Sequence, residues 1–161
     1  IIGFNVGSAV PEKRWPKERF GAVADHFAQE GYKTVFFGSP MDLDMVQDVV
    51  GSMKTKPIIA TGQFSIGELA AAMARCSLII TNDSWPIHVA ISQHVPIVAL
   101  YGPSNPMFYG PYKAKCIVLE SMDHYEIGKS MKQIIREGKY KGLSVITEAS
   151  VVEAAQTLLN E

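Results

Sequence analysis

The sequence predicts an α/β fold in which helices cover both faces of a parallel sheet, a three-layer α/β/α arrangement. Short apolar runs rich in β-branched and aromatic residues recur along the chain, and longer segments with a helical apolar period separate them. Strands that alternate with helices of this length form βαβ units, whose crossovers make the sheet parallel. With 161 residues and a hydrophobic fraction of 47%, we expect one domain over residues 1–161.

Three strands and three helices alternate in the first half of the chain. The strands are expected at residues 1–5, 34–37 and 57–60, and the helices at 17–30, 42–53 and 65–75. The first helix carries an apolar stripe and ends at Gly31, a residue that commonly terminates helices. The third helix begins with Ser65 and Glu68, which have the spacing of a capping box.

The second half repeats the alternation less regularly. Strands are expected at 77–81, 96–100 and 115–119, and helices at 86–93, around 127–135 and around 152–159. Pro86 suits the first turn of its helix because its missing N–H would have no partner there. The proline-rich segment 101–111 is expected to be a rigid loop that either lines a crevice or only turns the chain. Segment 121–143 is expected to hold exposed loops around one helix.

Composition excludes several classes of function. The net charge of −1 gives no electrostatic case for nucleic acid as a partner, and no apolar run approaches the roughly 20 residues of a membrane helix. Cys76 and Cys116 lack metal-ligand spacing and are expected to be buried, reduced thiols. The four histidines have no such spacing either, so we expect no metal site. The chain begins inside a strand at Ile1 with no signal peptide, which indicates a domain cut from a longer protein.

The strongest candidate site is the strand-to-helix turn at residues 81–88. Asn82, Asp83 and Ser84 follow an apolar run, and His88 lies in the helix that comes next. Ligands of parallel sheets bind outside such carboxyl ends, and we expect Asp83 or Ser84 to cap a helix whose free N–H groups receive phosphate. The alternative is that Asp83 is only a cap and His88 a satisfied, partly buried histidine. Because the polar residues cluster at the mouth of the sheet, the binding interpretation is favoured.

The loop after the first strand is a second candidate. Gly7 allows close approach of a ligand, Ser8 offers a hydroxyl and an N–H, and Lys13 supplies a charge for a diphosphate. The loop has neither the Walker spacing nor the GxGxxG fingerprint. The alternative, an ordinary loop whose Trp15 packs on the core, stays equally open.

Two further residues are candidates with alternatives of their own. Asp42, near the end of the second strand, can accept hydrogen bonds from the hydroxyls of a ribose or cap the following helix. The interpretation as a helix cap is somewhat favoured. Phe64 can cover a base or close the core, and core packing is favoured. Ser65 is expected to be a helix cap in either case.

Five segments in order resemble glycosyltransferase family 9, the ADP-heptose:lipopolysaccharide heptosyltransferases. They are Gly7-Ser8…Lys13-Arg14-Trp15-Pro16, Phe37-Gly38-Ser39-Pro40, Gly62…Ser65-Ile66-Gly67-Glu68-Leu69-Ala70, Thr81-Asn82-Asp83-Ser84…Pro86…His88-Val89-Ala90 and Leu100-Tyr101-Gly102-Pro103. The resemblance spans residues 1 to about 111 and continues more loosely to the last helix. Each motif alone is weak, but the five together are fairly specific.

This resemblance implies the C-terminal, donor-binding half of a GT-B glycosyltransferase, a Rossmann-like domain. By position, Ser8 and Lys13 would hold a diphosphate, Asp42 a ribose, residues near Phe64 a base, and Asp83, Ser84 and His88 the phosphates and sugar. The implied donor is an ADP-heptose-like nucleotide sugar bound without a metal cofactor. The implied acceptor is a lipopolysaccharide or related glycolipid, and the implied location is cytoplasmic, with the parent enzyme peripheral at the inner membrane.

The chain departs from the family pattern in two ways. Trp85 stands where the family usually has Gly, which would narrow the sugar pocket, change the sugar or block binding. The family's acceptor domain and catalytic carboxylate precede the point where this chain begins, so no catalytic residue is assigned, and the chain alone is expected to bind a donor and transfer nothing. A noncatalytic nucleotide- or sugar-binding module with a degenerate site and an unrelated Rossmann-like domain for another phosphorylated ligand remain alternatives.

Overall fold

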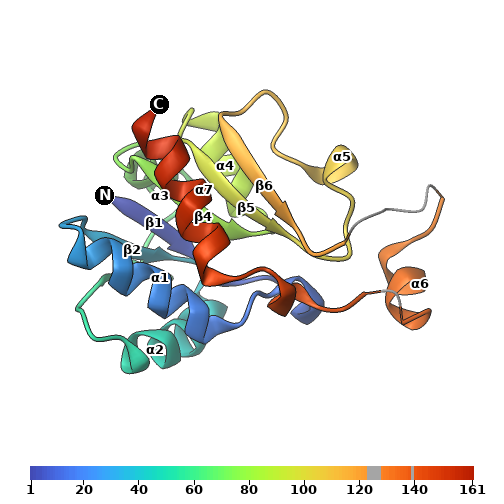
Figure 1. Ribbon diagram of the computed structural model, residues 1–161. Coiled ribbons are helices and arrows are strands. Elements are labelled where there is room, and N and C mark those ends of the chain that lie inside the picture. Colours follow the sequence, from blue (N-terminus) through green and yellow to red (C-terminus); the bar gives the residue numbers. More distant parts are fainter. Residues whose placement is uncertain (123–127, 139) are drawn as a thin grey trace.

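A six-stranded parallel sheet forms the centre of the domain (Figure 1). The computed structural model describes residues 1–122, 128–138 and 140–161. The strands are β1 (Ile2–Asn5), β2 (Thr34–Phe37), β3 (Ile58–Ile59), β4 (Leu78–Asn82), β5 (Ile97–Tyr101) and β6 (Cys116–Glu120). They are arranged in the order β3-β2-β1-β4-β5-β6, with every neighbouring pair parallel. This is the order of a Rossmann-like fold, so the predicted fold class is confirmed.

Helices cover both faces of the sheet. They are α1 (Lys17–Gln29), α2 (Leu43–Ser52), α3 (Ile66–Met73), α4 (Pro86–Ser92), α5 (Pro106–Tyr109), α6 (Met131–Arg136) and α7 (Glu148–Asn160), with the 3-10 turns η1 (Pro11–Lys13), η2 (Pro40–Asp42) and η3 (Leu143–Val145). The helices α1, α2 and α7 pack on one face, and α3 and α4 pack on the other. Figure 1 shows α5 and α6 on the side of the molecule toward which the strands run.

Each face of the sheet has its own buried core. On the face that α1 covers, the ring of Phe4 stacks on that of Phe36 with centroids 5.2 Å apart. Trp15 packs edge-on against Phe20 at 5.0 Å, and its indole N–H donates to the carbonyl of Ile146 at 2.9 Å. Trp15 is 1% exposed, so the core-packing alternative for this residue is correct. A buried indole with its N–H satisfied also fixes where the loop after β1 leaves the sheet.

The strand order reverses between β1 and β4, and this places a crevice at their carboxyl ends. Asn5, the last residue of β1, is in register with Phe37 on one side and Thr81 on the other. Its side-chain amide donates to the carbonyl of Gly7 and to the hydroxyl of Thr81, both at 3.2 Å. The loops after β1 and β4 therefore start side by side.

Most predicted element boundaries agree with the structure to within two or three residues. Ser65 and Glu68 form the predicted capping box at the start of α3, and Gly31 follows α1 with a φ of +92°. The third strand is shorter than predicted, with only Ile58 and Ile59 paired. Segment 101–111, expected to be a loop throughout, contains α5.

The helix predicted around residues 127–135 corresponds to α6. The predicted helical residue Ile127 and the predicted loop residues Asp123 to Tyr125 lie outside the described residues. Cys76 and Cys116 are both free thiols, as expected. Cys76 is buried, and burial raises the pKa of its thiol to about 11. Cys116 is only half-buried, because it lies on the edge strand β6.

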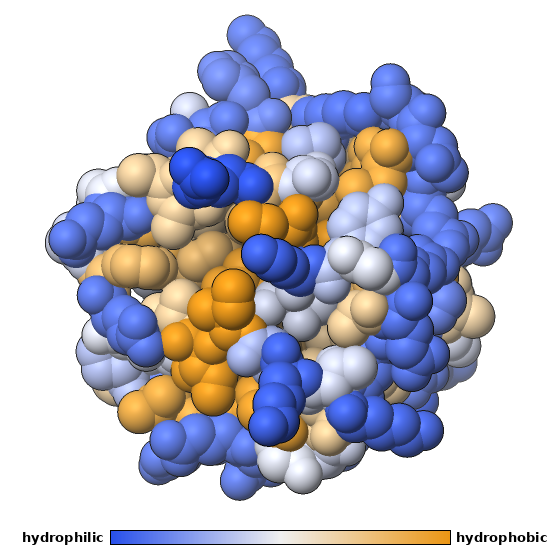
Figure 2. Space-filling model, turned by 90° about the vertical axis from the view of Figure 1, so that its left-hand side faces the viewer, coloured by the Kyte–Doolittle hydropathy of each residue, from blue (hydrophilic) through white to orange (hydrophobic). Residues whose placement is uncertain are grey.

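None of the helices in the described part of the chain is long and apolar enough to span a membrane. The side of the molecule that carries the N-terminus faces the viewer in Figure 2, where hydrophilic side chains surround a central hydrophobic area. The candidate site residues that follow β1 and β4 lie at the opposite ends of these strands.

Candidate functional site

Lys13, Asp83 and Ser104 meet at the carboxyl edge of the sheet. Lys13 ends η1 after β1, Asp83 directly follows β4, and Ser104 lies between β5 and α5. The ammonium of Lys13 is 2.6 Å from Oδ2 of Asp83, and the hydroxyl of Ser104 donates a hydrogen bond to the same oxygen. The side chain of Asp83 is 9% exposed and that of Lys13 is 17% exposed. Three loops thus bring a cation, a carboxylate and a hydroxyl to the place where the sequence predicts a ligand.

Asn82, the last residue of β4, ties the end of that strand to the loop after β1. Its side-chain carbonyl accepts from the backbone N–H of Trp15 at 2.9 Å, and its amide donates to the carbonyl of Val6 at 2.8 Å. Both partners belong to the loop after β1, and the Asn82 side chain is fully buried. Sequence reasoning assigned Asn82 no role of its own, although a polar residue at the end of a buried strand was the available signal.

Two tyrosines lie beside this cluster. The ring centroid of Tyr109 is 5.7 Å from the ammonium of Lys13, within the range of a cation–π contact. The hydroxyl of Tyr140 donates to the carbonyl of Glu12, the residue before Lys13. Burial raises the pKa of Tyr140 to about 12, so this hydroxyl remains a donor at neutral pH. Tyr140 was not predicted as a site residue, because its contact joins segments far apart in the chain.

Gly7 lies against the carboxylate of Asp42. A Cβ atom on Gly7 would be 2.2 Å from Oδ1 of Asp42, so any larger residue here requires the Asp42 carboxylate to shift. The other carboxylate oxygen accepts from the N–H of Ser39 at 2.8 Å and from its hydroxyl at 2.7 Å. Asp42 stands at the start of α2 but makes no side-chain capping bond to it. Asp42 takes the N-cap position of α2 as expected, but its carboxylate turns back to Ser39 and does not bond the first N–H groups of that helix.

Ser8 is 6% exposed and is already engaged within its loop. Its hydroxyl accepts from the N–H of Val10 at 3.3 Å, and its carbonyl accepts from Nε of Arg14 at 2.8 Å. These bonds fold the loop after β1 back on itself and fix the start of η1 next to Asp83.

The residues that open α4 are more exposed. Ser84 is half-buried, Trp85 is 45% exposed, and the imidazole of His88 is exposed one turn later. The expectation that Asp83 or Ser84 caps this helix is wrong: Trp85 takes the N-cap position, and no side chain makes a capping bond. Asp83 cannot serve there because Lys13 and Ser104 hold its carboxylate. The alternative of a partly buried His88 is also wrong, whereas Pro86 stands in the first turn as predicted.

Phe64 corrects a further expectation. Its side chain is 42% exposed, so the favoured interpretation that it closes the core is wrong. It directly precedes the N-cap Ser65 of α3, in the connection that follows β3. Along the sheet edge, β2 therefore lies between the strand that Phe64 follows and the strand that Lys13 follows, and both β2 and β1 lie between those of Phe64 and Asp83.

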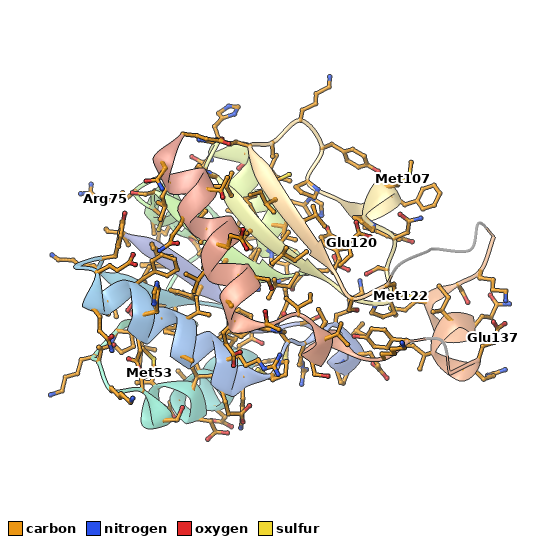
Figure 3. The ribbon with its side chains drawn as sticks, in the orientation of Figure 1. Met53, Arg75, Met107, Glu120, Met122 and Glu137 are labelled. Atoms are coloured by element: carbon orange, nitrogen blue, oxygen red, sulfur yellow. The ribbon has the colours of Figure 1, made fainter. Side chains whose placement is uncertain are left out.

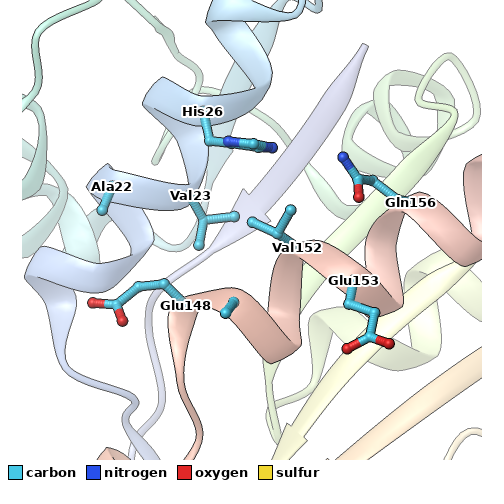
Figure 4. A pocket seen from close by; sticks show the side chains of 8 residues that line it. Ala22, Val23, His26, Glu148, Val152, Glu153 and Gln156 are labelled. Atoms are coloured by element: carbon cyan, nitrogen blue, oxygen red, sulfur yellow. The ribbon is translucent and has the colours of Figure 1, made fainter.

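Several hollows are present on the described surface, and two of them exceed 400 Å³. One, of about 450 Å³, adjoins Lys13 and Ser104 and is bounded by α5 and α6. The other, of about 440 Å³, lies between α1 and α7, with Val23 and Val152 on facing helices (Figure 4). No predicted site residue lines the second hollow. Within the described residues, no group of three or more potential ligands could hold a metal ion.

Comparison with known proteins agrees with this geometry. The family model of glycosyltransferase family 9 (heptosyltransferase) matches residues 1–141. Lipopolysaccharide heptosyltransferase 2 of Escherichia coli K12 is 34% identical, over 99% of this chain and 47% of its own. The structure of a family 9 glycosyl transferase from Veillonella parvula matches with a TM-score of 0.94 and 72% identity, over 99% of this chain and 45% of that one. The structure of E. coli ADP-heptose lps heptosyltransferase II matches with a TM-score of 0.83 and 32% identity, over 99% and 46%.

The chain spans about half the length of the curated relatives it matches. The family match nevertheless covers most of the chain, including every residue of the Lys13–Asp83–Ser104 cluster. The fold, the site position and these similarities agree with one another, and the chain belongs to glycosyltransferase family 9, the heptosyltransferase family.

Proposed function

We propose that this chain binds a nucleoside diphosphate sugar, an ADP-heptose-like donor, as one domain of a GT-B glycosyltransferase of the bacterial cell envelope. The observation that carries the proposal is the pairing of Lys13 with Asp83 at the carboxyl edge of a Rossmann-like sheet. Supporting it are the relatives, one of which is called an ADP-heptose lps heptosyltransferase. Adenine and heptose come to this chain from that relationship.

Lys13 and Asp83 have complementary roles in this proposal. A leaving nucleoside diphosphate gains negative charge as its bond to the sugar breaks, and the ammonium of Lys13 would stabilise that charge. Oδ2 of Asp83 is held by Lys13 and Ser104, whereas no described residue donates to Oδ1. Oδ1 is therefore able to accept from a hydroxyl of the donor sugar. Binding in this form requires no metal ion.

The remaining predicted residues are placed around this pair. Ser8, Ser84 and His88 would contact the phosphates and sugar, and Trp85 would limit the size of the sugar. Gly7 allows the approach of Asp42, whose carboxylate lies in the crevice region and would accept from a ribose. Phe64 would lie near the base. These roles require the donor to extend along the sheet edge from β4 toward β3.

Transfer requires a second domain that carries the acceptor and the catalytic base. We assign that role to the part of the relatives that this chain does not span, and we assign no general base within the chain. The acceptor would be a lipopolysaccharide or related glycolipid, and the parent enzyme would work at the cytoplasmic face of the inner membrane. This chain alone would bind the donor and transfer nothing.

A noncatalytic module is the second candidate, and Trp85 is the observation that favours it. Its large side chain is 45% exposed at the start of α4, two residues after Asp83. If the indole covered the site, the chain would keep its sheet and lose the donor.

Calorimetric titration with ADP, UDP, GDP and CDP, without and with magnesium, tests the proposal. We expect ADP to bind without magnesium and its affinity to fall by about 1.5–3 kcal/mol in Lys13→Ala, the value of one charge-assisted contact. Lys33→Ala, an exposed lysine before β2, is the matched control and should change nothing. Absence of binding for all four nucleotides would reject the donor site in this chain and favour the noncatalytic candidate.

A further inference from the structure

Tyr140 joins two segments that lie far apart in the sequence, beside the proposed donor site. Figure 3 shows Glu137, the residue that ends α6, on the side of the molecule toward which the strands run, and Tyr140 follows it closely in the chain. The Tyr140 hydroxyl donates a hydrogen bond to the carbonyl of Glu12, in η1. The next residue of η1 is Lys13, whose ammonium is paired with Asp83. One hydrogen bond thus ties the chain after α6 to the backbone next to this lysine.

The turn η1 depends on polar contacts because it has no buried residue of its own. A helical turn leaves its last carbonyl groups without N–H partners within the turn. The N–H of Trp15 would reach the Glu12 carbonyl if the 3-10 turn continued, but it donates to the side chain of Asn82 instead. Tyr140 supplies the donor that this carbonyl lacks.

Gly102 leaves the space in which this bond forms. It lies in the loop after β5 and is buried. A Cβ atom on Gly102 would be 2.7 Å from the hydroxyl oxygen of Tyr140 and 3.2 Å from the carbonyl oxygen of Glu12. The segments after β1, β5 and α6 therefore meet at one closely packed hydrogen bond.

This bond restrains the backbone that carries Lys13. Because Glu12 and Lys13 are consecutive residues, a movement of η1 away from the sheet breaks both the Tyr140–Glu12 bond and the Lys13–Asp83 pair. A neutral hydrogen bond favours the closed arrangement over such a local opening by about two- to tenfold. Burial raises the pKa of Tyr140 to about 12, so the phenol keeps its donor proton at neutral pH.

We propose that Tyr140 is a positioning residue of the donor site, which fixes η1 so that the Lys13 ammonium is held where the diphosphate binds. The inference rests on the proposed donor function, because the diphosphate is the ligand that benefits from a fixed lysine. A side chain that is already held in place loses less conformational freedom when its ligand binds. Tyr140 acts through Glu12 and Lys13 and makes no contact with the donor in this assignment.

Acetylation of the ligand-free chain by acetic anhydride tests the position of Lys13 without a donor. The Lys13 side chain is 17% exposed and paired, so its amine should react slowly. Tyr140→Phe keeps the ring and removes the hydroxyl, so η1 should open more often and Lys13 should react about fivefold faster, as mass spectrometry measures. Lys17, paired with Asp48 at 2.6 Å, is the internal reference and should keep its native rate. Tyr32→Phe, at the far end of α1 from η1, should change neither rate.

Calorimetric titration with ADP measures the consequence for binding. The affinity should fall about fivefold in Tyr140→Phe and remain native in Tyr32→Phe. In the Lys13→Ala background, Tyr140→Phe should cause no further loss, because the hydroxyl acts through Lys13. Gly102→Ala is a second route to the same test: its Cβ would displace the Tyr140 hydroxyl from Glu12 while the tyrosine stays in the chain, so it should reproduce both effects.

Two acetylation results would overturn the proposal: a native rate at Lys13 in Tyr140→Phe, or an equal acceleration of Lys13 and Lys17, which would indicate a general loss of structure. An unchanged ADP affinity in Tyr140→Phe, beside a clear loss in Lys13→Ala, would also overturn it. Absence of ADP binding in the native chain would instead reject the donor function, and the acetylation rates would still decide whether Tyr140 fixes Lys13.

Discussion

Lys13 and Asp83 form a shielded ion pair, with 2.6 Å between the ammonium and Oδ2, that joins the loop after β1 to the end of β4. These two loops flank the point where the strand order reverses, so the pair closes the base of the crevice. A diphosphate that reaches Lys13 must share its ammonium with a carboxylate. The proposed donor would therefore meet this pair with two of its parts, an anion at Lys13 and a sugar hydroxyl at Asp83.

Asp83→Asn separates these two parts. Because the variant removes a negative charge beside Lys13, its affinity for ADP should increase by about 1 kcal/mol. The affinity for an ADP-sugar should increase less, since a neutral amide is a weaker acceptor for the sugar hydroxyl. Calorimetry with ADP and ADP-glucose measures both, and Asp44→Asn on the exposed surface of α2 is the control. Weaker ADP binding in Asp83→Asn would show that the pair does not compete with the phosphate.

Gly7 and Gly67 provide a matched pair for the role of close packing. A Cβ at Gly7 would overlap the Asp42 carboxylate, whereas one at Gly67 in α3 would meet nothing within 4 Å. We expect Gly7→Ala to lower the free energy of unfolding by about 1–3 kcal/mol through overpacking. Gly67→Ala, in the first turn of α3, should raise it by about 0.4–1 kcal/mol, because alanine loses less backbone entropy on folding than glycine. Urea unfolding measures both changes, and a neutral Gly7→Ala would show that Asp42 moves away without cost.

Asp25 links stability to pH. Burial acts to raise the pKa of its carboxyl, but hydrogen bonds from the N–H of Lys54 and from the N–H and hydroxyl of Thr55, at 2.6–2.9 Å, outweigh burial and lower it. A lowered pKa contributes stability above the unfolded value near 3.8, and that stability is lost as the pH falls through the folded value. Asp25→Asn should therefore cost about 1–3 kcal/mol near neutral pH.

The difference between Asp25→Asn and the native chain should shrink as the pH falls below 4, which urea unfolding at several pH values measures. Asp44→Asn again serves as the exposed control. A difference that stays constant with pH would contradict the assignment, because the charge of Asp25 would then make no contribution to folding.

Local signals explain which parts of this structure the sequence predicts. The ends of α1 and α3 follow from Gly31 and from the Ser65–Glu68 box, which depend on neighbouring residues only. Sequence position also placed Lys13 and Asp83 at one edge of the sheet, since both follow strands. Their direct contact was not predicted, and this is why the expected cap by Asp83 was wrong.

Long-range contacts account for the other omissions. The hydroxyl of Ser104 reaches Asp83 from the loop after β5, and Tyr140 reaches Glu12 from beyond α6. The apolar periodicity of the sequence does not predict such contacts, because each depends on how the loops are arranged in the folded domain. Phe64 is an example of a wrong prediction from local sequence. An aromatic residue beside a strand suggests a core position, but Phe64 is exposed in the folded domain.

Trp85 provides a direct measurement of where the donor sugar lies. The chain has two tryptophans, and Trp15 is 1% exposed whereas Trp85 is 45% exposed, so a soluble quencher of indole fluorescence reaches mainly Trp85. If Trp85 borders the sugar, saturation with ADP-glucose should protect its fluorescence from acrylamide, and saturation with ADP should protect it less. Trp85→Phe should abolish the protected signal, and Trp15 supplies the constant background.

Trp85→Gly tests the same contact through affinity. Removing the indole should widen the pocket, so the affinity for ADP-glucose should change relative to that for ADP while the affinity for ADP itself stays the same. The affinity for ADP itself should stay the same, because in the proposed complex the diphosphate contacts Lys13 and not Trp85. Two results together would show that Trp85 points away from the donor: the ratio of the ADP-glucose and ADP affinities is the same in Trp85→Gly as in the native chain, and acrylamide quenches the fluorescence equally in both complexes. Other residues would then limit the size of the sugar.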